Sequence, residues 1–415
     1  MSFKSEFELV PLGDVAQFIN GDRSSNYPKG DDYIDNGTPF ISAADIGEGR
    51  VDYSCVRRIS GIAYERLRGG KIQRNDVLFC LRGSIGKIAY VREQESGAIA
   101  SSLVIVRATG KIDSRYLFFS LSSQAGQQAA SGLNNGAAQP NLSVGEMQKI
   151  RIPLPLVPIQ RRIASILSAY DDLIENHRKR IAVLEEMARR LYREWFVHFR
   201  YPGHEAVPLV DSLLGRVPQG WEVRAFASLA EYRNGYAFKP DDWGSIGIPI
   251  IKIKELKAGV SSETPRNSGA SIQTKYHFDS GAILFSWSAD LDTYLWSGGP
   301  GLLNQHLFLV IPSPDIHKDW LFHGLKEGMP RFRSLSLGAT MHHIKRSALD
   351  QVSTLWPGRQ VADSFGELVK PLHDLSINLQ SQVAVLRRTR DLLLPRLMSG
   401  ALSVEALATA EAAVP

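Results

Sequence analysis

A long stretch of helical hydrophobic spacing follows Pro158. From Ile163 to Trp195, mostly apolar residues recur at alternating intervals of four and three positions, which is the heptad pattern of a helix that packs along another helix. A helix of about 39 residues would be roughly 58 Å long at 1.5 Å per residue, well beyond the usual length of a globular helix. The pattern therefore predicts a long helix that requires a partner helix.

A suitable partner occurs later in the same chain. Phe365 follows Ile163 by 202 residues, and from Phe365 to Leu397 mostly apolar residues recur with the same spacing. Pro357 matches Pro155 at the same shift, so the chain contains an internal repeat. We expect the two helices to form an antiparallel coiled coil. The expected seam consists of Ile163, Leu167, Tyr170, Ile174, Ile181, Leu184 and Leu191 on the first helix, and Phe365, Val369, Leu372, Leu379, Val383, Leu386 and Leu393 on the second.

The repeat extends backwards through the segment that precedes each helix. Residues 37–41, GTPFI, match residues 247–251, GIPII, and residues 101–106, SSLVIV, match residues 305–310, QHLFLV. Short β-branched runs alternate with Gly, Asn, Asp and Pro turns, and residues 115–130 form the clearest short helix. The chain is therefore predicted to be α+β, with two homologous domains, each an irregular, mostly antiparallel sheet with helices, related by a pseudo-twofold repeat. The expected boundaries are 1–155 for the first domain, 156–200 for its long helix, 201–356 for the second domain with its linker, 357–402 for the second long helix and 403–415 for a flexible tail.

Three prolines mark the junction between the first domain and its long helix. Pro153 and Pro155 favour an extended strand, because proline lacks the N–H that a helix interior requires. Pro158 can occupy a first helical turn, where the missing N–H has no intrahelical partner. We therefore expect a stiff strand to end the domain immediately before the helix starts.

Composition narrows the classes of function only slightly. A chain of 415 residues with 44% hydrophobic and 22% charged residues can bury the cores of two or three domains. No stretch reaches the roughly 20 apolar residues that span a bilayer, so we expect a cytoplasmic protein without membrane contact. Cys55 and Cys80 form neither a disulfide framework nor a paired metal motif. The net charge of +5 weakly favours a polyanionic partner.

Two related domains on two long helices have the organisation of a covalent pseudo-dimer. A dimeric reader of duplex DNA contacts two half-sites at a fixed separation. Because the two domains have diverged in sequence, the two half-sites should differ. The repeat therefore favours an asymmetric, two-part DNA target over a palindrome.

The chain resembles the specificity subunits of Type I restriction-modification systems over nearly its whole length. Residues 152–167, IPLPLVPIQRRIASIL, and the helix that follows resemble the central conserved region of that family. Residues 386–402, LRRTRDLLLPRLMSGAL, resemble its C-terminal conserved region. Residues 83–89, GSIGKIA, and 303–310, LNQHLFLV, resemble segments that are common in its target recognition domains.

The resemblance implies a division of labour within a larger complex. The specificity subunit would have no catalytic residue and no metal site, each target recognition domain would read one half of a bipartite double-stranded DNA sequence, and the helices would act as a spacer. Two methyltransferase subunits would dock on it, bind S-adenosylmethionine and methylate adenine N6. Restriction subunits that use ATP and Mg²⁺ would join the complete assembly.

Base-reading candidates come from loops in which the two domains differ, because Arg pairs well with guanine, and Asn or Gln with adenine. The turn RGSIGK, residues 82–87, lacks the spacing of a nucleotide-binding phosphate loop, and is either a DNA phosphate contact or a purely structural turn. The candidates are Arg23, Ser24, Asn26, Tyr27, Lys29, Arg82, Lys87, Asn134, Asn135 and Gln139 in the first domain, and Tyr236, Lys239, Asp241, Trp243, His342, His343, Lys345 and Arg346 in the second.

Two other classes of function stay open on the residues alone. A Pro-Asp pair ending at Asp241, followed by Glu255 and Lys257, has the form of a metal-dependent nuclease motif. The repeat argues against it, since at a shift of 210 residues Glu255 falls on Asp45 and Lys257 on Gly47, which indicates a structural role. The second alternative is a coiled-coil scaffold whose globular domains bind protein instead of DNA.

Overall fold

The computed structural model describes residues 7–23, 25–92, 97–133, 141–212, 215–336 and 343–404. It consists of two compact units, and each unit contains part of both long helices. Unit 1 contains the chain up to Asp172 and from Arg387 onward, and unit 2 is Leu173–Leu386. The expected flexible tail lies outside the described residues from position 405 onward.

A four-stranded antiparallel sheet is the centre of unit 1. Its order is β2-β10-β7-β8, built from β2 (Ala16–Asn20), β10 (Leu103–Ala108), β7 (Val77–Cys80) and β8 (Ile88–Tyr90). A smaller sheet has the order β6-β3-β9, from β6 (Arg58–Ile59), β3 (Tyr33–Ile41) and β9 (Ala98–Ile99), with β3 and β9 parallel. The other elements are the pairs β1 (Leu9–Pro11) with β11 (Arg151–Pro153) and β4 (Ile46–Gly47) with β5 (Arg50–Val51), and the helices α1 (Gly61–Arg66), α2 (Ser114–Ser122), α3 (Gln124–Gly132) and α4 (Val144–Gln148).

The central strands of unit 1 are buried on both faces. Successive side chains of a strand point to opposite faces, so the run VLFC of β7 contributes to two different cores. Val77 and Phe79 pack in the same cluster as Tyr116 of α2, whereas Leu78 and Cys80 pack in another cluster that includes residues of β3 and β9. A helix therefore covers one face of the sheet and the smaller sheet covers the other.

Unit 2 repeats this arrangement. Its antiparallel sheet has the order β15-β22-β19-β20, from β15 (Ala230–Asn234), β22 (Leu307–Pro312), β19 (Ile283–Ser286) and β20 (Asp292–Leu295). The second sheet has the order β17-β16-β21-β18, from β17 (Arg266–Asn267), β16 (Ile248–Ile251), β21 (Gly301–Leu303) and β18 (His277–Phe278), with β16 and β21 parallel. The other elements are the pairs β12 (Leu209–Ser212) with β13 (Gly215–Pro218) and β14 (Glu222–Ala225) with β23 (Ser353–Trp356), and the helices α6 (Ile253–Ala258), α7 (Lys318–Ser334) and α8 (Ala348–Gln351). The predicted α+β class and internal repeat are confirmed.

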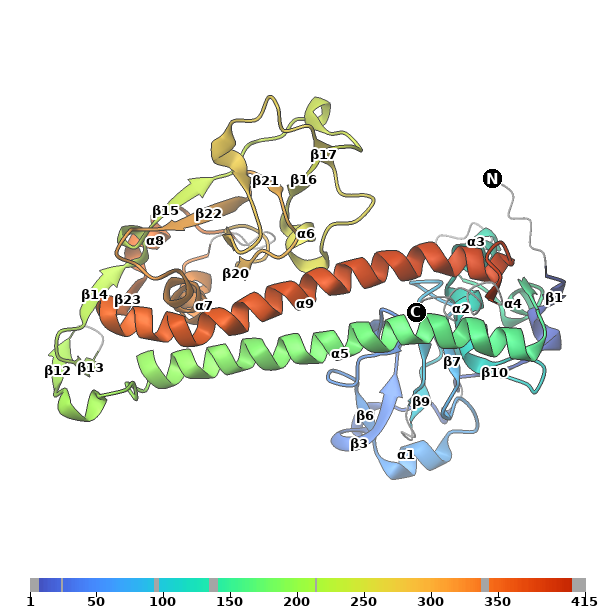
Figure 1. Ribbon diagram of the computed structural model, residues 1–415. Helices are drawn as coiled ribbons and strands as arrows, with labels where there is room; N and C mark the ends of the chain where they lie inside the picture. The colour runs from blue at the N-terminus through green and yellow to red at the C-terminus, as the bar shows by residue number, and fades with distance from the viewer. Residues whose placement is uncertain are drawn as a thin grey trace, which may run out of the picture. The chain divides into compact units, whose positions relative to one another are not determined.

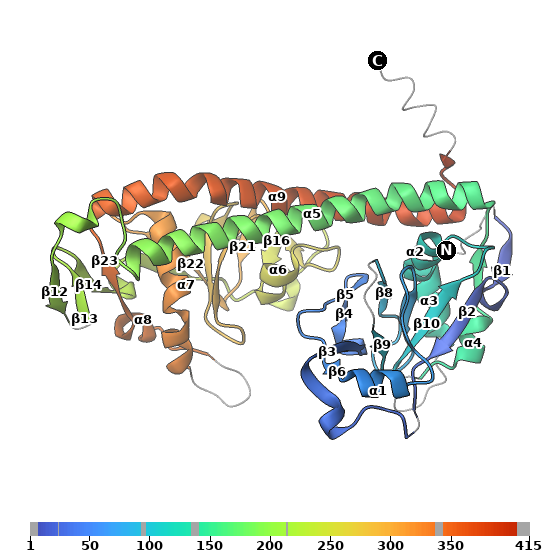
Figure 2. The ribbon, with the colours of Figure 1, turned by 90° about the horizontal axis from the view of Figure 1, so that it is seen from below.

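The long helices are α5 (Val157–Phe196) and α9 (Arg359–Ser399), and they lie side by side in opposite directions (Figures 1 and 2). In unit 2, Tyr192 late in α5 contacts Phe365 early in α9, with ring centroids 5.8 Å apart. In unit 1, Asp171 earlier in α5 accepts a hydrogen bond of 2.6 Å from Arg390 late in α9. The predicted antiparallel pair is confirmed.

The expected seam residues of α5 and α9 are all at least partly buried. Seven are buried, namely Ile163, Leu167, Ile174, Phe365, Val369, Leu379 and Val383. Seven are half-buried, namely Tyr170, Ile181, Leu184, Leu191, Leu372, Leu386 and Leu393. The heptad spacing thus identifies the inward side of both helices.

The proline junction has the expected conformation, whereas the short helix differs. Pro153 ends β11, and Pro158 lies in the first turn of α5, where its missing N–H removes no helical hydrogen bond. The helix expected over residues 115–130 is divided into α2 and α3 at Ser123. Ser123 has an extended backbone (φ −62°, ψ 155°), and its Oγ accepts a hydrogen bond of 3.1 Å from the N–H of Gly126. A serine that caps a new helix therefore interrupts the predicted one.

Candidate nucleic-acid interface

Strand register brings several loops of unit 1 to one edge of the central sheet. Asn20, the last residue of β2, pairs with Val104 at the start of β10, and Cys80, the last residue of β7, pairs with Leu103. The loop after β2, the loop before β10 and the turn after β7 consequently lie next to one another. We call this edge, with the loops that it carries, the unit 1 loop edge.

A fourth segment joins the unit 1 loop edge from the region before α4. The N–H of Leu142 donates to the main-chain oxygen of Leu81 at 2.9 Å, and Arg82 and Asn141 form an isolated antiparallel bridge. Four segments that are far apart in the sequence therefore converge at this edge.

Two guanidinium groups belong to the unit 1 loop edge. Arg82 donates from Nε to Oδ1 of Asn141 at 3.1 Å, and Arg23 donates from Nη2 to the main-chain oxygen of Ser101 at 3.3 Å. Partial burial, and then the charge of Arg82, lower the pKa of Arg23. Both acceptors are uncharged, so these hydrogen bonds leave two neighbouring positive charges at the surface. Such a pair attracts an anion such as a DNA phosphate.

The other described candidates of unit 1 lie on the segment after β2 and in the turn after β7. Tyr27 packs edge-on against Phe40 with ring centroids 5.4 Å apart, and burial raises the pKa of its hydroxyl, which stays protonated. Lys87 is exposed and donates to the main-chain oxygen of Ala43 at 3.0 Å. Lys29 is exposed and Asn26 is half-buried. The loops therefore combine positive charge, an aromatic ring and amide groups.

Unit 2 has an equivalent edge, which we call the unit 2 loop edge. Asn234 at the end of β15 pairs with Phe308 of β22, and Ser286 at the end of β19 pairs with Leu307. The N–H of Ile344 donates to the main-chain oxygen of Trp287 at 3.0 Å. The segment before α8 therefore joins the strand ends as the segment before α4 does in unit 1.

The polar groups of the unit 2 loop edge differ from those of unit 1. Ser288 and His343 form the isolated antiparallel bridge at the position that Arg82 and Asn141 occupy in unit 1. The buried Ser288 places Oγ 3.2 Å from Nδ1 of His306, whose side chain is exposed. The same main-chain arrangement thus carries two arginines in one unit and hydroxyl and imidazole groups in the other.

The remaining described candidates of unit 2 lie at the surface or partly buried. Trp243 is 48% exposed, and Nζ of Lys252 lies 4.2 Å from the centroid of its ring. Arg346 lies over the ring of Phe308 at 5.8 Å. Lys239, Asp241, His343 and Lys345 are exposed, and Tyr236 is half-buried.

Five candidates lie outside the described residues: Ser24, Asn134, Asn135, Gln139 and His342. Conversely, Ser101, Asn141, Ser288 and His306 lie at the loop edges but were not among the candidates. The internal repeat contains a signal for one of them, because Asn141 and the candidate His343 are separated by the same 202 residues as the helix seams.

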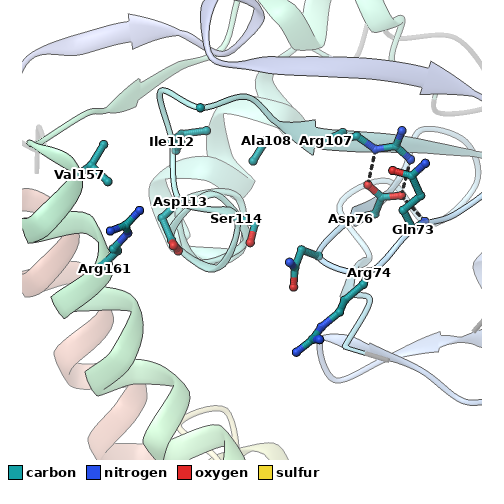
Figure 3. A pocket seen from close by; sticks show the side chains of 12 residues that line it. Gln73, Arg74, Asp76, Arg107, Ala108, Ile112, Asp113, Ser114, Val157 and Arg161 are labelled. Atoms are coloured by element: carbon teal, nitrogen blue, oxygen red, sulfur yellow. Dashed lines mark hydrogen bonds and ion pairs between the residues drawn. The ribbon is translucent and has the colours of Figure 1, made fainter. Parts of the chain in front are cut away.

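A cavity of about 340 Å³ opens at the opposite end of the central strands of unit 1, beside the start of α5. Figure 3 shows Arg107 paired with Asp76 on one side of it, and Asp113 and Arg161 on the other. Arg107 donates from Nε and Nη2 to the two carboxylate oxygens of Asp76 at 2.7 and 2.8 Å, and this pair links the turn before β7 to β10. The ion pair therefore stabilises the wall of the cavity, which is a structural role.

The residues of the nuclease-like motif have structural roles. Glu255 accepts from the N–H of Lys252 at 3.0 Å and from the hydroxyl of Thr264 at 3.2 Å, so its carboxylate caps α6. Asp45, which the repeat matches to Glu255, caps in the same way and accepts from the N–H of Ser42 at 2.7 Å.

The lysine of that motif points to a different partner. Nζ of Lys257 lies 2.6 Å from the carboxylate of Asp290. Side chains two residues apart on a helix do not face each other, so Glu255 and Lys257 do not share a site on α6. Across the part of the chain that the structure describes, no three His, Cys, Asp or Glu residues could together hold a metal ion. The geometry does not support a metal-dependent nuclease there.

Among the described helices, none is long and apolar enough to cross a membrane.

Comparisons with known proteins agree with the duplicated architecture. The model of the Type I restriction modification DNA specificity domain matches residues 4–186 and again 218–354. The chain is 24% identical over 413 residues to the Type I restriction enzyme MjaIX specificity subunit of Methanocaldococcus jannaschii, covering 97% of this chain and 95% of that protein. It is 20% identical to the HindI specificity subunit of Haemophilus influenzae, covering 94% of this chain and 100% of that protein.

A crystal structure shows the same fold. The S subunit of a Type I restriction-modification system from M. genitalium superposes with a TM-score of 0.56 at 13% identity, covering 96% of this chain and 98% of that one. Since the family model matches well over half of the sequence, the chain belongs to the DNA specificity subunits of Type I restriction-modification systems.

Proposed function

We propose that this non-catalytic subunit reads a bipartite, asymmetric DNA sequence, with one half-site for each loop edge. The observation that carries the proposal is the duplicated loop edge, which has the same strand register but different polar side chains in the two units. Equivalent frames favour equivalent placement on DNA, and different polar groups favour different bases. The long helices α5 and α9 would then set the gap between the half-sites.

We further propose that α5 and α9 dock methyltransferase subunits. Both helices expose large apolar side chains in unit 2 that are not among the seam residues, and two of these positions recur at the repeat shift of 202 residues. Leu173 and Leu375 are 43% and 40% exposed, and Val183 and Val385 are 58% and 64% exposed. The recurrence of these exposed apolar side chains at repeated positions supports two similar partners.

The cofactors of the proposed complex belong to its other subunits. S-adenosylmethionine would bind to the methyltransferase subunits, which would methylate adenine N6, and ATP with Mg²⁺ would bind to the restriction subunits. All of these act on double-stranded DNA, which favours a cytoplasmic location.

The decisive experiment is to express the chain with its methyltransferase subunit and to map N6-methyladenine in the host genome. We expect one two-part asymmetric motif with an unspecified gap. Replacement of residues 205–353 by those of a relative with another specificity should change only one part. A contiguous palindrome, or no methylation by an active methyltransferase, would contradict the proposal. The second outcome would favour the scaffold alternative, in which the units bind protein.

A further inference from the structure

We infer that Arg82 is a specificity-determining residue that reads a guanine in the half-site of unit 1, and that Asn141 is its positioning residue. The inference rests on the proposed function and deepens it, because it assigns one base to one side chain.

The two loop edges share one main-chain frame. Main-chain hydrogen bonds of 2.9 Å (Leu142 to Leu81) and 3.0 Å (Ile344 to Trp287) hold the same two segments together in each unit. The neighbouring loops also approach in the same way, because a Cβ on Gly21 or on Gly235 would collide with main-chain oxygens of the segment before β10 or β22. Side chains therefore do not build this frame.

The residue that follows the main-chain acceptor, Leu81 or Trp287, has a different side chain in the two units. It is Arg82, bridged to Asn141, in unit 1, and Ser288, bridged to His343, in unit 2. A conserved main-chain frame with different side chains is expected at a position that selects a sequence, since base-edge contacts carry sequence information and phosphate contacts do not carry it directly.

The Arg82 guanidinium is oriented for a bidentate contact. Its Nε–H is held by Oδ1 of Asn141, and this bond leaves the two terminal nitrogens of the fork for another acceptor pair. Guanine offers O6 and N7 side by side in the major groove, and this pair matches an arginine fork. Arg82 is exposed, so a duplex can reach it. Arg23, whose charge lies nearby, is suited to an adjacent phosphate.

The corresponding group of unit 2 cannot make that contact. Ser288 is buried, and its hydroxyl holds Nδ1 of His306, so that this imidazole has one ring nitrogen, Nε2, left for a partner. A single imidazole nitrogen cannot replace the two terminal nitrogens of a guanidinium group. The two half-sites should therefore differ at the base that each frame faces.

The test uses the full chain in complex with its methyltransferase subunit and compares methylated motifs genome-wide. In wild type, one half-site should contain a guanine that Arg82→Ala no longer requires, with discrimination lowered by about tenfold to a hundredfold, the usual value of a bidentate base contact. The other half-site should stay unchanged. Arg82→Lys keeps the charge but replaces the fork with a single ammonium group, so it should weaken the guanine preference less than Arg82→Ala does, with a smaller loss of overall methylation.

Two variants of Asn141 separate positioning from a purely structural role. Asn141→Ala should relax the same guanine without affecting any other base. Asn141→Asp retains the acceptor for Nε and should preserve the guanine preference, while its negative charge lowers methylation at all sites. If Asn141→Ala lowered methylation uniformly and left the motif intact, the positioning role would be refuted.

Arg74→Ala is the matched control, because Arg74 is another exposed arginine of unit 1 and lies at the opposite end of the central strands. It should leave the motif unchanged. A wild-type motif that Arg82→Ala and Arg82→Lys both leave intact would overturn the inference alone. Absence of any two-part motif in wild type would overturn the proposed function as well. Should Arg82→Ala not fold, as judged by its thermal melting, Arg82→Gln, which also lacks the guanidinium fork, decides the outcome.

Discussion

At the scale of single residues, unit 2 contains a buried chain of three polar side chains between α7 and α9. Nε2 of His323 lies 3.0 Å from Nε2 of His373, and Nδ1 of His373 lies 2.7 Å from the carboxylate of Asp319. Burial, and then the neighbouring His373, lower the pKa of His323 to about 3. His323 is therefore neutral in the folded protein at neutral pH.

This shift makes unit 2 less stable in mild acid. Below the ordinary pKa of about 6.5, the unfolded state binds a proton at His323 that the folded state does not bind until about pH 3. The free energy of unfolding should therefore fall as the pH drops through this window, by about 2 kcal/mol between pH 7 and pH 4.5. The His323→Gln variant should lack this pH-dependent fall in the free energy of unfolding, which urea unfolding at pH 7 and pH 4.5 would measure. His198→Gln, at an exposed histidine, should behave as wild type.

Glu255 provides a second residue-scale prediction. Glu255→Ala removes the cap of α6 and the acceptor for Thr264, and should lower the free energy of unfolding by about 1–2 kcal/mol. Lys257→Ala removes only an exposed ion pair with Asp290, so its effect should stay below about 1 kcal/mol. Chemical denaturation measures both values. Mg²⁺-dependent DNA cleavage by the isolated wild-type chain that disappears in Glu255→Ala would instead support the nuclease hypothesis.

Individual site residues could be predicted from the sequence only in part. Arg82 was a candidate because it lies in the turn RGSIGK, but its partner Asn141 was not, because that contact depends on strand register and on the bridge between distant segments. Ser288 and His306 were not predicted as site residues for a related reason. Their residue types are common in loops, and only their hydrogen bond across two loops distinguishes them.

At the scale of secondary-structure elements, the exposed apolar side chains of α5 and α9 lead to a docking prediction. Val183→Glu combined with Val385→Glu should abolish co-purification with the methyltransferase subunit, because two charges would be desolvated in an apolar interface. Thermal stability should change little, since both side chains are exposed in the chain alone.

The control for this docking prediction uses the preceding residue of each helix. Ala182→Glu combined with Ala384→Glu changes exposed residues on another side of the same helices, and should retain the methyltransferase subunit. Size-exclusion chromatography with mass measurement reports the subunit stoichiometry. Full complex formation by the valine variant would rule out this surface as the docking site.

Long elements were predicted more reliably than short ones. The seams of α5 and α9 follow from a heptad pattern sustained over many residues, so a single exception does not alter the prediction. The division at Ser123 could not be predicted in the same way, because one local hydrogen bond to the N–H of Gly126 determines it. The register of the strands was not predicted, because short β runs do not specify their partners.

At the scale of the whole molecule, the proposed spacer role predicts a measurable change in the DNA motif. Inserting seven residues at matching positions in both α5 and α9 preserves the heptad seam and adds about 10.5 Å, or about three base pairs of duplex. The gap between the half-sites should change while both half-sites remain the same. The same insertion in α5 alone mismatches the seams and should impair assembly. Methylation mapping would detect both results, and an unaltered gap with intact assembly would contradict the spacer role.

The composition of the two units affects how the chain responds to a break in its backbone. Unit 1 combines residues up to Asp172 with residues from Arg387 onward, whereas unit 2 lies between them. A protease cut near residue 205 would produce two fragments. Each unit would still contain segments of both fragments. Tyr192 and Phe365 would remain packed in unit 2, and Asp171 and Arg390 paired in unit 1. Because each fragment contributes to both units, noncovalent packing should hold the cut protein together. Its fragments could separate only if the cores of both units unfolded.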